Sequence, residues 1–327
     1  MSSNYNKSIN YALIDKKVFF LRKAEQYIAK IIFRNHILTY NGQQFEDFFV
    51  SIMTKSNPSL YPVKAYGNIG DEKNDGFDRT TGTYYQIFAP EDLHKNQTIY
   101  EAVKKLKNDF EGLYENWNDD VPIKNFYFVI NDKNKGLPST IHKAIIDLDK
   151  KYNDISINPF TAKDLESVFD VLNWDSKIDI VGFIPDEIFP VVETDALNET
   201  VSHLMKVELT KSTRDSLIIP DFDEKIVFNG LSDIVKNKLV TGSYQENILI
   251  QYFNANPGVR EILQRKFHEL YLQSKDDISD DQENSADSRF YYILEKACHK
   301  NTISIQSSVF VLMAYYFSSC DIFEEPK

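Results

Sequence analysis

The sequence predicts a mixed α/β domain followed by an all-helical domain. Up to about residue 172, short β-type segments alternate with amphipathic helical segments, which is typical of a sheet flanked by helices. After about residue 195 the apolar residues recur almost only at helical spacing. The length of 327 residues is enough for two hydrophobic cores. We therefore expect an α/β domain at 11–172, a transition at 173–194 and a helical domain at 195–327.

Helical spacing predicts helices at about residues 13–36 and 44–55, separated by the chain break at Asn41 and Gly42. Short β segments follow at about 61–66, 76–79 and 83–88, with Thr80, Thr81 and Gly82 as a turn. The rest of the first domain is predicted as a helix at 98–117, a strand at 125–130, a helix at 138–151, a strand at 155–159 and a helix at 161–172 that starts at Thr161 as its N-cap.

Six helices are predicted in the second domain, at residues 196–207, 224–240, 244–253, 259–273, 288–299 and 305–317. Residues 276–287 are acidic and polar, a composition typical of a solvated, mobile loop.

Charge is distributed unevenly along the chain, whose formal net charge is −12. Residues 1–160 carry 21 basic and 20 acidic side chains, whereas residues 161–327 carry 16 and 29. A basic surface for nucleic acid would therefore lie in the first half. Apolar runs are too short to span a membrane, and a signal-peptide pattern is missing. The two cysteines form no disulfide framework or zinc motif, so we expect a cytoplasmic protein.

Three side chains predict a cation site in the first domain. Asp75 lies near the start of the predicted β-hairpin, Gln86 lies on its return strand, and Glu46 lies on the preceding amphipathic helix. Carboxylate and amide oxygens are ligands that Mg²⁺ accepts, and a bound cation activates water against a phosphodiester. Each residue alone is more often structural, and an Asp before Gly is usually a turn residue. The combination of the three favours a metal site.

The segments QFEDFF (44–49), GDEKNDG (70–76) and YYQIFAP (84–90) together resemble the Mrr-like and Cap4-like branch of the PD-(D/E)XK nucleases. The resemblance implies a restriction-endonuclease-like fold and Mg²⁺- or Mn²⁺-dependent cleavage of double-stranded DNA. It assigns Glu46, Asp75 and Gln86 to the metal and to catalysis. Phe88 stands where the family pattern has lysine. If the strand already includes residue 73, Lys73 and Asp75 point to the same face of it. Lys73 is therefore our first candidate to replace the family lysine, and Lys64 is the second.

A second resemblance covers the last third of the chain. The segment DEKIVFNGL (223–231) and the closing segments MAYYF (313–317) and CDIFE (320–324) resemble the C-terminal domain of ABC-three-component systems, which include the Lamassu class of bacterial antiphage defence. The resemblance implies an SMC-like ATPase subunit and a small third subunit as partners. We predict that Tyr315, Asp321, Phe323 and Glu324 lie at or near the partner contact. An ordinary amphipathic last helix is the alternative for this segment.

The sequence thus predicts a DNA endonuclease effector that its partner subunits hold inactive and that forms a homo-oligomer when active, without a membrane. Lys104, Lys105 and Lys107 are candidate DNA contacts, although a charged solvent-exposed helix face explains them as well. Two alternatives stay open. One is a non-catalytic adaptor that keeps the nuclease fold for complex assembly, which Phe88 favours, and the other is a nuclease that acts on RNA.

Overall fold

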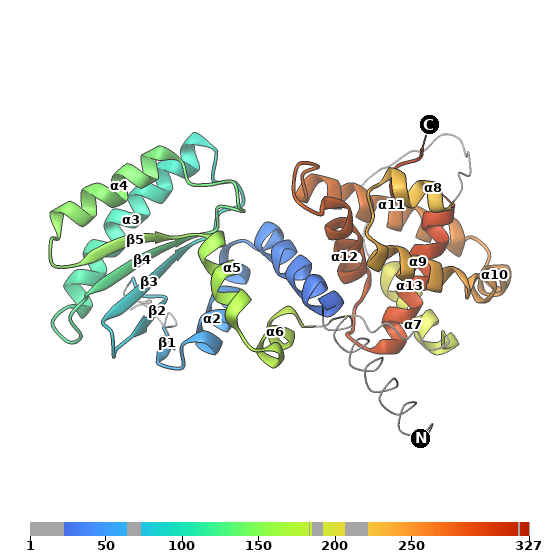
Figure 1. Ribbon diagram of the computed structural model, residues 1–327, viewed down its shortest axis with the longest axis horizontal. Coiled ribbons are helices and arrows are strands. Elements are labelled where there is room, and N and C mark those ends of the chain that lie inside the picture. Colours follow the sequence, from blue (N-terminus) through green and yellow to red (C-terminus); the bar gives the residue numbers. More distant parts are fainter. Residues whose placement is uncertain are drawn as a thin grey trace, which may run out of the picture. The chain divides into compact units, whose positions relative to one another are not determined.

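The computed structural model describes residues 23–63, 73–182, 184, 192–206, 222–319 and 321–326. The chain divides into two compact units, which Figure 1 shows coloured along the sequence. One unit spans residues 36–180, and the other combines residues 1–35 with 181–327. The sequence places residues 11–36 in the first domain, but the described residues 23–35 fold with the C-terminal unit.

Residues 36–180 contain a five-stranded mixed sheet with the strand order β1-β2-β3-β4-β5. The strands β1 (Leu60–Pro62), β2 (Gly76–Asp78) and β3 (Thr83–Phe88) are antiparallel neighbours. The strands β4 (Asn125–Ile130) and β5 (Ser156–Phe160) continue the sheet parallel to β3. Parallel neighbours need a crossover, and a helix precedes each of these two strands. The prediction of a mixed sheet flanked by helices is confirmed.

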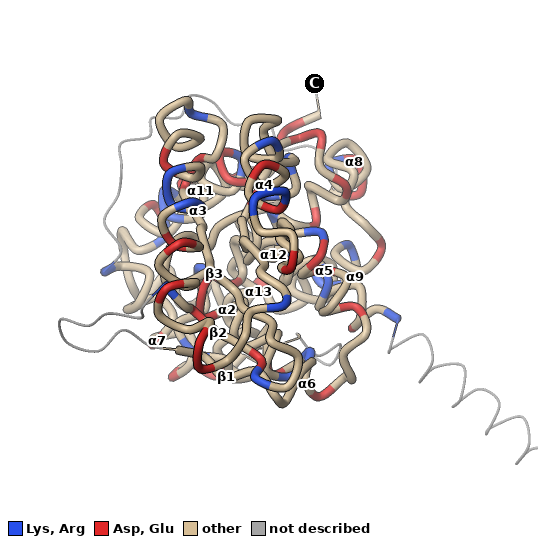
Figure 2. Tube along the Cα trace, turned by 90° about the vertical axis from the view of Figure 1, so that its left-hand side faces the viewer, with Lys and Arg blue, Asp and Glu red and all other residues tan. Residues whose placement is uncertain are grey.

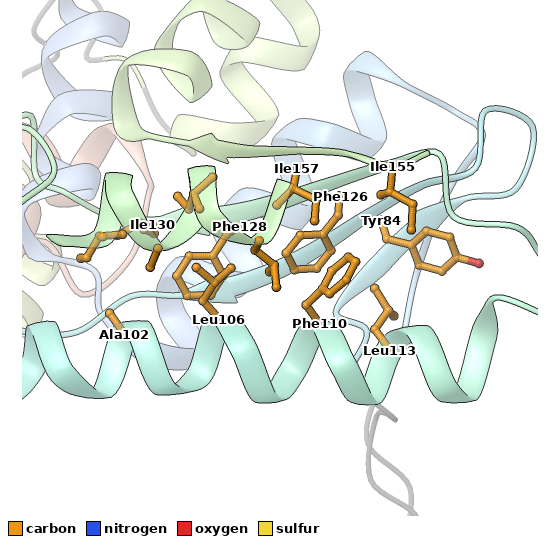
Figure 3. Packing of buried hydrophobic residues seen from close by; sticks show 14 of the residues in the cluster. Tyr84, Ala102, Leu106, Phe110, Leu113, Phe126, Phe128, Ile130, Ile155 and Ile157 are labelled. Carbon is orange, nitrogen blue, oxygen red and sulfur yellow. The ribbon is translucent and has the colours of Figure 1, made fainter. Parts of the chain in front are cut away.

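Helices cover both faces of this sheet. On one face, α3 (Asn96–Trp117) and α4 (Ser139–Lys151) pack on β4, with Leu106 and Phe110 of α3 against Phe126 and Phe128 (Figure 3). On the other face, the Phe49 ring of α2 (Gly42–Ser56) lies 5.6 Å from that of Tyr85, between ring centroids. The helix α5 (Ala162–Val171) packs against α2 and begins with the predicted Thr161 cap, which forms a capping box with Asp164.

The turn between β2 and β3 is fixed by two residues. The carboxylate of Asp78 accepts hydrogen bonds from the backbone N–H and the hydroxyl of Thr80, at 2.8 and 2.6 Å. Gly82 has φ +66°, and a Cβ there would lie 2.6 Å from the carbonyl oxygen of Pro122. Only glycine fits this position, which confirms the predicted turn at 80–82.

The C-terminal unit is built around α13 (Ile303–Ser318), whose residues 305–317 are all buried. The surrounding helices are α7 (Thr194–Leu204), α9 (Asp233–Ser243), α10 (Glu246–Ala255), α11 (Val259–Asp277) and α12 (Ser285–Ala297). A helix that is apolar on all sides must be enclosed by others. The last predicted helix is therefore the centre of the unit rather than an amphipathic surface helix.

Residues 23–35 are helical and belong to this same unit. The Tyr27 hydroxyl donates to the Asp287 carboxylate at 2.8 Å, and the Asn35 amide donates to the Ser288 carbonyl at 2.9 Å. Ile31 and Phe33 are buried. These contacts join positions about 250 residues apart, which local sequence patterns cannot predict.

Three predicted elements are corrected by the structure. The transition contains a helix, α6 (Trp174–Val181). The single helix expected at 224–240 is two helices, α8 (Phe222–Phe228) and α9, because Gly230 with φ +68° ends the first and Ser232 caps the second. The acidic segment 276–287 is largely helical at its ends, and Arg289 holds its turn by donating to the Ile278 carbonyl.

Among the described helices, none combines the length and the apolar character needed to cross a membrane.

Candidate functional site

The hairpin of β2 and β3 brings Asp75 and Gln86 together. Gly76 pairs with Tyr85 in the strand register, which places the preceding Asp75 opposite Gln86. The Gln86 Nε2 atom donates to Asp75 Oδ2 at 2.8 Å, and the backbone N–H of Ile87 donates to the same oxygen at 2.5 Å. Both residues are buried, with 6% and 2% of their surface exposed. The Asp75 carboxylate is thus held beside β3, directly before the first residue of β2.

Next to this pair, three buried polar atoms have no hydrogen-bond partner within the described structure. They are Gln86 Oε1 and both side-chain polar atoms of Asn74. A buried polar atom without a partner costs about 1–3 kcal/mol, so such atoms point to a water or a ligand. The two ends of an amide are similar in size, so Gln86 can turn its oxygen toward a shared cation without needing more room.

Glu46 is half-buried on α2, and two contacts place this helix along β3. The backbone N–H of Gly42 donates to the Ala89 carbonyl at 2.7 Å, and Phe49 packs on Tyr85. Glu46 lies between these two anchor points, beside the part of β3 that carries Gln86. Neighbouring residues of a strand point to opposite faces, so α2 covers the Tyr85 face and Gln86 points to the other. Glu46 therefore lies on the opposite face of the sheet from Gln86, and its contact with a cation beside Gln86 stays a prediction.

Lys73 does not lie on a strand, so the prediction that strand parity turns it toward Asp75 is wrong. It has φ +67° in a turn before β2. Its Nζ atom lies 3.2 Å from Asp109 Oδ1 on α3, and its side chain passes over Gly112. The second substitute, Lys64, falls outside the described residues.

Asp109 is a buried carboxylate that sequence reasoning missed. It is 3% exposed, and Lys105 one turn earlier on α3 binds its Oδ2 atom at 2.5 Å. Asp109 continues the buried stripe that includes Leu106 and Leu113, and a carboxylate in an apolar stripe is the signal that could have found it. The trace of α3 carries both basic and acidic residues (Figure 2), with Lys104, Lys105 and Lys107 preceding Asp109, Glu111 and Glu115. Of the predicted DNA contacts, Lys104 and Lys107 are exposed and Lys105 is half-buried.

The family position of the strand lysine is filled by an aromatic ring. Phe88 stacks on Phe128 with a centroid distance of 6.2 Å and packs against the core below α3. A positively charged side chain at this site must come from outside β3.

Two side chains at this site, Asp75 and Gln86, carry the oxygen atoms that a hard divalent cation prefers. Within the described ranges, His, Cys, Asp and Glu form no group of three or more that could hold a metal. A cation would therefore rely on the Asp75 carboxylate and the Gln86 amide oxygen, with water completing its shell. For this donor set the Gln86 amide must turn over, so that its oxygen rather than its Nε2 atom faces Asp75.

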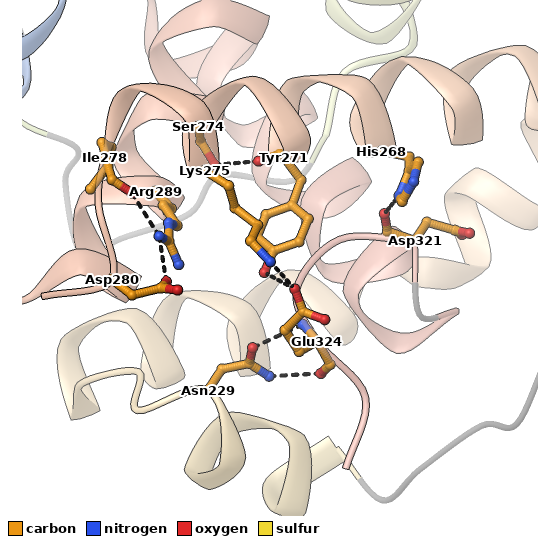
Figure 4. A network of polar contacts seen from close by, with 10 residues as sticks. All are labelled: Asn229, His268, Tyr271, Ser274, Lys275, Ile278, Asp280, Arg289, Asp321 and Glu324. Carbon is orange, nitrogen blue, oxygen red and sulfur yellow. Dashed lines mark hydrogen bonds and ion pairs between the residues drawn. The ribbon is translucent and has the colours of Figure 1, made fainter. Parts of the chain in front are cut away.

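In the C-terminal unit, the two segments singled out by sequence contact each other directly. The Lys225 Nζ atom, on a residue 1% exposed, donates to the carbonyl oxygens of Phe317 and Ile322, each at 2.8 Å. Asn229 exchanges two hydrogen bonds with the backbone of Glu324, at 2.8 and 2.9 Å (Figure 4). The closing segment is therefore bound to α8 by polar groups.

The four predicted partner-contact residues are mostly internal. Tyr315, Asp321 and Phe323 are 7%, 2% and 4% exposed. The Asp321 carboxylate accepts from Gln264 at 2.7 Å. Glu324 remains about half exposed and binds Lys275 and the Tyr271 hydroxyl, at 2.6 and 3.0 Å. The closing segment holds its own unit together, and of the four residues Glu324 alone offers an accessible side chain to a partner.

Comparison with protein families gives a match to most of this helical unit. Residues 195–324 match the model of C-terminal domain 10 of the ABC-three component (ABC-3C) systems. The match excludes the unit at 36–180 and the helical residues 23–35. No curated protein and no solved structure matches the chain.

Proposed function

We propose that this protein is the DNA endonuclease effector of a multi-subunit ABC-three-component antiphage system. In this proposal residues 36–180 cleave double-stranded DNA with Mg²⁺ or Mn²⁺, and the C-terminal unit binds the partner subunits. Membership in such a system rests on the family match at 195–324. Nuclease activity rests on the buried contact of Asp75 with Gln86 beside an unpartnered amide oxygen.

The order of elements supports the nuclease part. A helix, three antiparallel strands, a helix and a parallel strand follow one another, as the sequence resemblance led us to expect. Asp75 and Gln86 occupy the hairpin positions that the resemblance assigns to metal ligands.

In catalysis, Asp75 and Gln86 would bind the cation together with Glu46, and the cation would supply Lewis-acid activation of water and of the phosphate. The hydrogen bond from the Ile87 backbone fixes the carboxylate of Asp75 before any ligand arrives. A fixed ligand lowers the reorganisation needed in the transition state. Gln86 contributes a neutral donor, which leaves the site less negative toward a phosphodiester than a second carboxylate would.

The decisive experiment is plasmid cleavage by the purified protein with Mg²⁺, compared with EDTA and with Asp75→Ala. We expect nicking or linearisation that EDTA abolishes and that Asp75→Ala lowers by at least about a hundredfold, as for loss of a central catalytic group. An Asp92→Ala variant serves as the control, because Asp92 is a partly exposed carboxylate near Lys95. Equal cleavage by Asp75→Ala would overturn the proposal. Cleavage of RNA but not of DNA would favour the RNA alternative.

A non-catalytic adaptor is the second candidate, and the packing of Phe88 into the core favours it. An adaptor predicts that Asp75→Ala leaves phage protection unchanged in cells, whereas the nuclease predicts its loss. Assembly of the Asp75→Ala variant with the partner subunits must stay intact for this comparison to count.

Partner binding can be tested on α8, where Val227 and Phe228 are 78% and 52% exposed beside the buried Lys225 and Ile226. Changing both exposed residues to Ser keeps the internal contacts of this unit. We expect the double variant to lose co-purification with the SMC-like ATPase and the small third subunit. At the end of the chain, Glu324→Lys is the cleaner second test, because reversing the charge of Asp321 as well would disturb a buried group.

A further inference from the structure

Two lysines and one buried carboxylate form a compact charged cluster next to Asp75. The carboxylate of Asp109, whose side chain is 4% exposed, lies 3.2 Å from Lys73 Nζ and 2.5 Å from Lys105 Nζ. The two lysine side chains are 50% and 33% exposed. The cluster therefore carries a net positive charge, with its negative charge inside and its two ammonium groups toward solvent.

The cluster is tied to the Asp75–Gln86 pair by a short stretch of backbone. Only Asn74 separates Lys73 from Asp75, so the two Cα atoms lie at most about 7 Å apart. Lys105 comes from α3, which packs on the face of the sheet that includes Tyr84 and Phe88, the same face as Gln86. Both lysines thus belong to the side of the hairpin on which Gln86 lies.

We propose that Lys73 and Lys105, held by Asp109, form the phosphate-binding subsite for a nucleic-acid backbone at this site. The inference rests on the proposed function. It assigns a source for the positive charge that is missing from β3, where Phe88 replaces the strand lysine. Asp109 is a positioning residue: it fixes two flexible side chains at one spot, which lowers the entropy cost of binding phosphate. Lysine ammonium groups bind phosphate as point charges, so two of them beside a metal site suit a phosphodiester.

Binding of a short DNA duplex, followed by fluorescence anisotropy over a series of salt concentrations, tests this subsite without cleavage. Ca²⁺ replaces Mg²⁺ in the assay so that the duplex stays intact. The logarithm of the binding constant falls linearly with the logarithm of the salt concentration, and removal of one lysine–phosphate interaction makes this negative slope shallower by about 0.9. We expect the double variant Lys73→Ala/Lys105→Ala to have a slope shallower by about 1.8 and to bind the duplex at least about tenfold more weakly.

The matched control is Lys55→Ala with Lys151→Ala, which removes the same charge from the same unit. Lys55 pairs with Asp179 at 2.7 Å and Lys151 with Glu111 at 2.8 Å, so each control lysine is held by a carboxylate other than Asp109. We expect the control to change the slope by less than about 0.5. Equal slopes for the two double variants would overturn the inference, even if the wild-type protein cleaves DNA. Absence of any binding by the wild-type protein would instead remove the proposed function itself.

Asp109→Asn separates positioning from simple attraction. The substitution removes a negative charge, so attraction alone predicts tighter binding of DNA. If Asp109 positions the lysines, binding weakens and the salt slope falls despite the added positive charge, because an amide cannot pair with two ammonium groups. Tighter binding with an unchanged slope would overturn the positioning role.

Discussion

Two sets of buried polar groups, one in each unit, differ in one respect. In the C-terminal unit, Lys225, Asp287 and Asp321 each have hydrogen-bond partners within the chain. In the unit at 36–180, Gln86 and Asn74 keep buried side-chain atoms that no described group satisfies. Partnered polar groups specify a structure, whereas unpartnered ones cost stability and persist for another reason. Unpartnered buried atoms also occur in the C-terminal unit, among them the Tyr291 hydroxyl and Arg289 Nε, so such an atom alone does not identify a ligand site.

Lys225→Met is expected to give the largest loss of stability. Methionine fills a similar volume but leaves the Phe317 and Ile322 carbonyls without this donor, at a cost of about 3 kcal/mol. Hydrogen exchange of α13 amides in the full chain measures the local free energy of opening. Unchanged protection of α13 would contradict the assignment of Lys225 as the link between α8 and the closing segment.

Asp287→Ala should destabilise the same unit by about 2 kcal/mol. The Asp287 carboxylate accepts hydrogen bonds from the Tyr27 hydroxyl and the Ser232 backbone N–H. Its loss therefore removes one contact of the helix at 23–35 and one at the start of α9. Denaturant unfolding measures the effect. Glu283→Ala is the control, because Glu283 forms an exposed pair with Arg34 and should change stability by less than about 0.5 kcal/mol. Equal losses would argue that residues 23–35 add little to the unit.

Asp78 predicts an acid-dependent loss of stability in the sheet unit. Burial alone would raise its pKa, but hydrogen bonds from Thr80 and Asn57 outweigh burial and lower the pKa to about 2. A depressed pKa stabilises the fold above about pH 4, and this contribution, on the order of 1–2 kcal/mol, is lost as the pH falls through about 2. Unfolding free energies of the wild type and Asp78→Asn should therefore converge between about pH 4 and pH 2. A constant difference over that range would contradict the assignment.

Asn74→Ala should have the smallest effect and the opposite sign. Both polar atoms of its side chain are buried without a partner in the described structure, so their removal should leave stability unchanged or raise it by about 1 kcal/mol. Thermal unfolding without divalent metal measures this. A loss above about 1 kcal/mol would mean that Asn74 has a structural partner and would weaken the contrast between the two sets of buried groups.

Local patterns predict most elements of the fold, because hydrophobic period and turn residues act over a few positions. The bounds predicted for β4, at 125–130, are the observed ones, and the Thr161 cap is predictable because a capping box is local. The pairing of Asp75 with Gln86 follows from a hairpin. The packing of residues 23–35 on α12 and the salt bridge from Lys73 to Asp109 are not predictable in this way, since each joins distant segments. The left-handed turn conformation of Lys73 likewise cannot be predicted from the alternation of side chains along a strand.

The placement of residues 23–35 has a consequence for synthesis of the chain. These residues leave the ribosome before the unit at 36–180, but their partners on α12 are made about 250 residues later. At roughly 5–20 residues per second, the unit at 36–180 has time to fold while the helix still lacks its binding surface. The C-terminal unit is therefore complete only after α12 has been synthesised and has bound this helix.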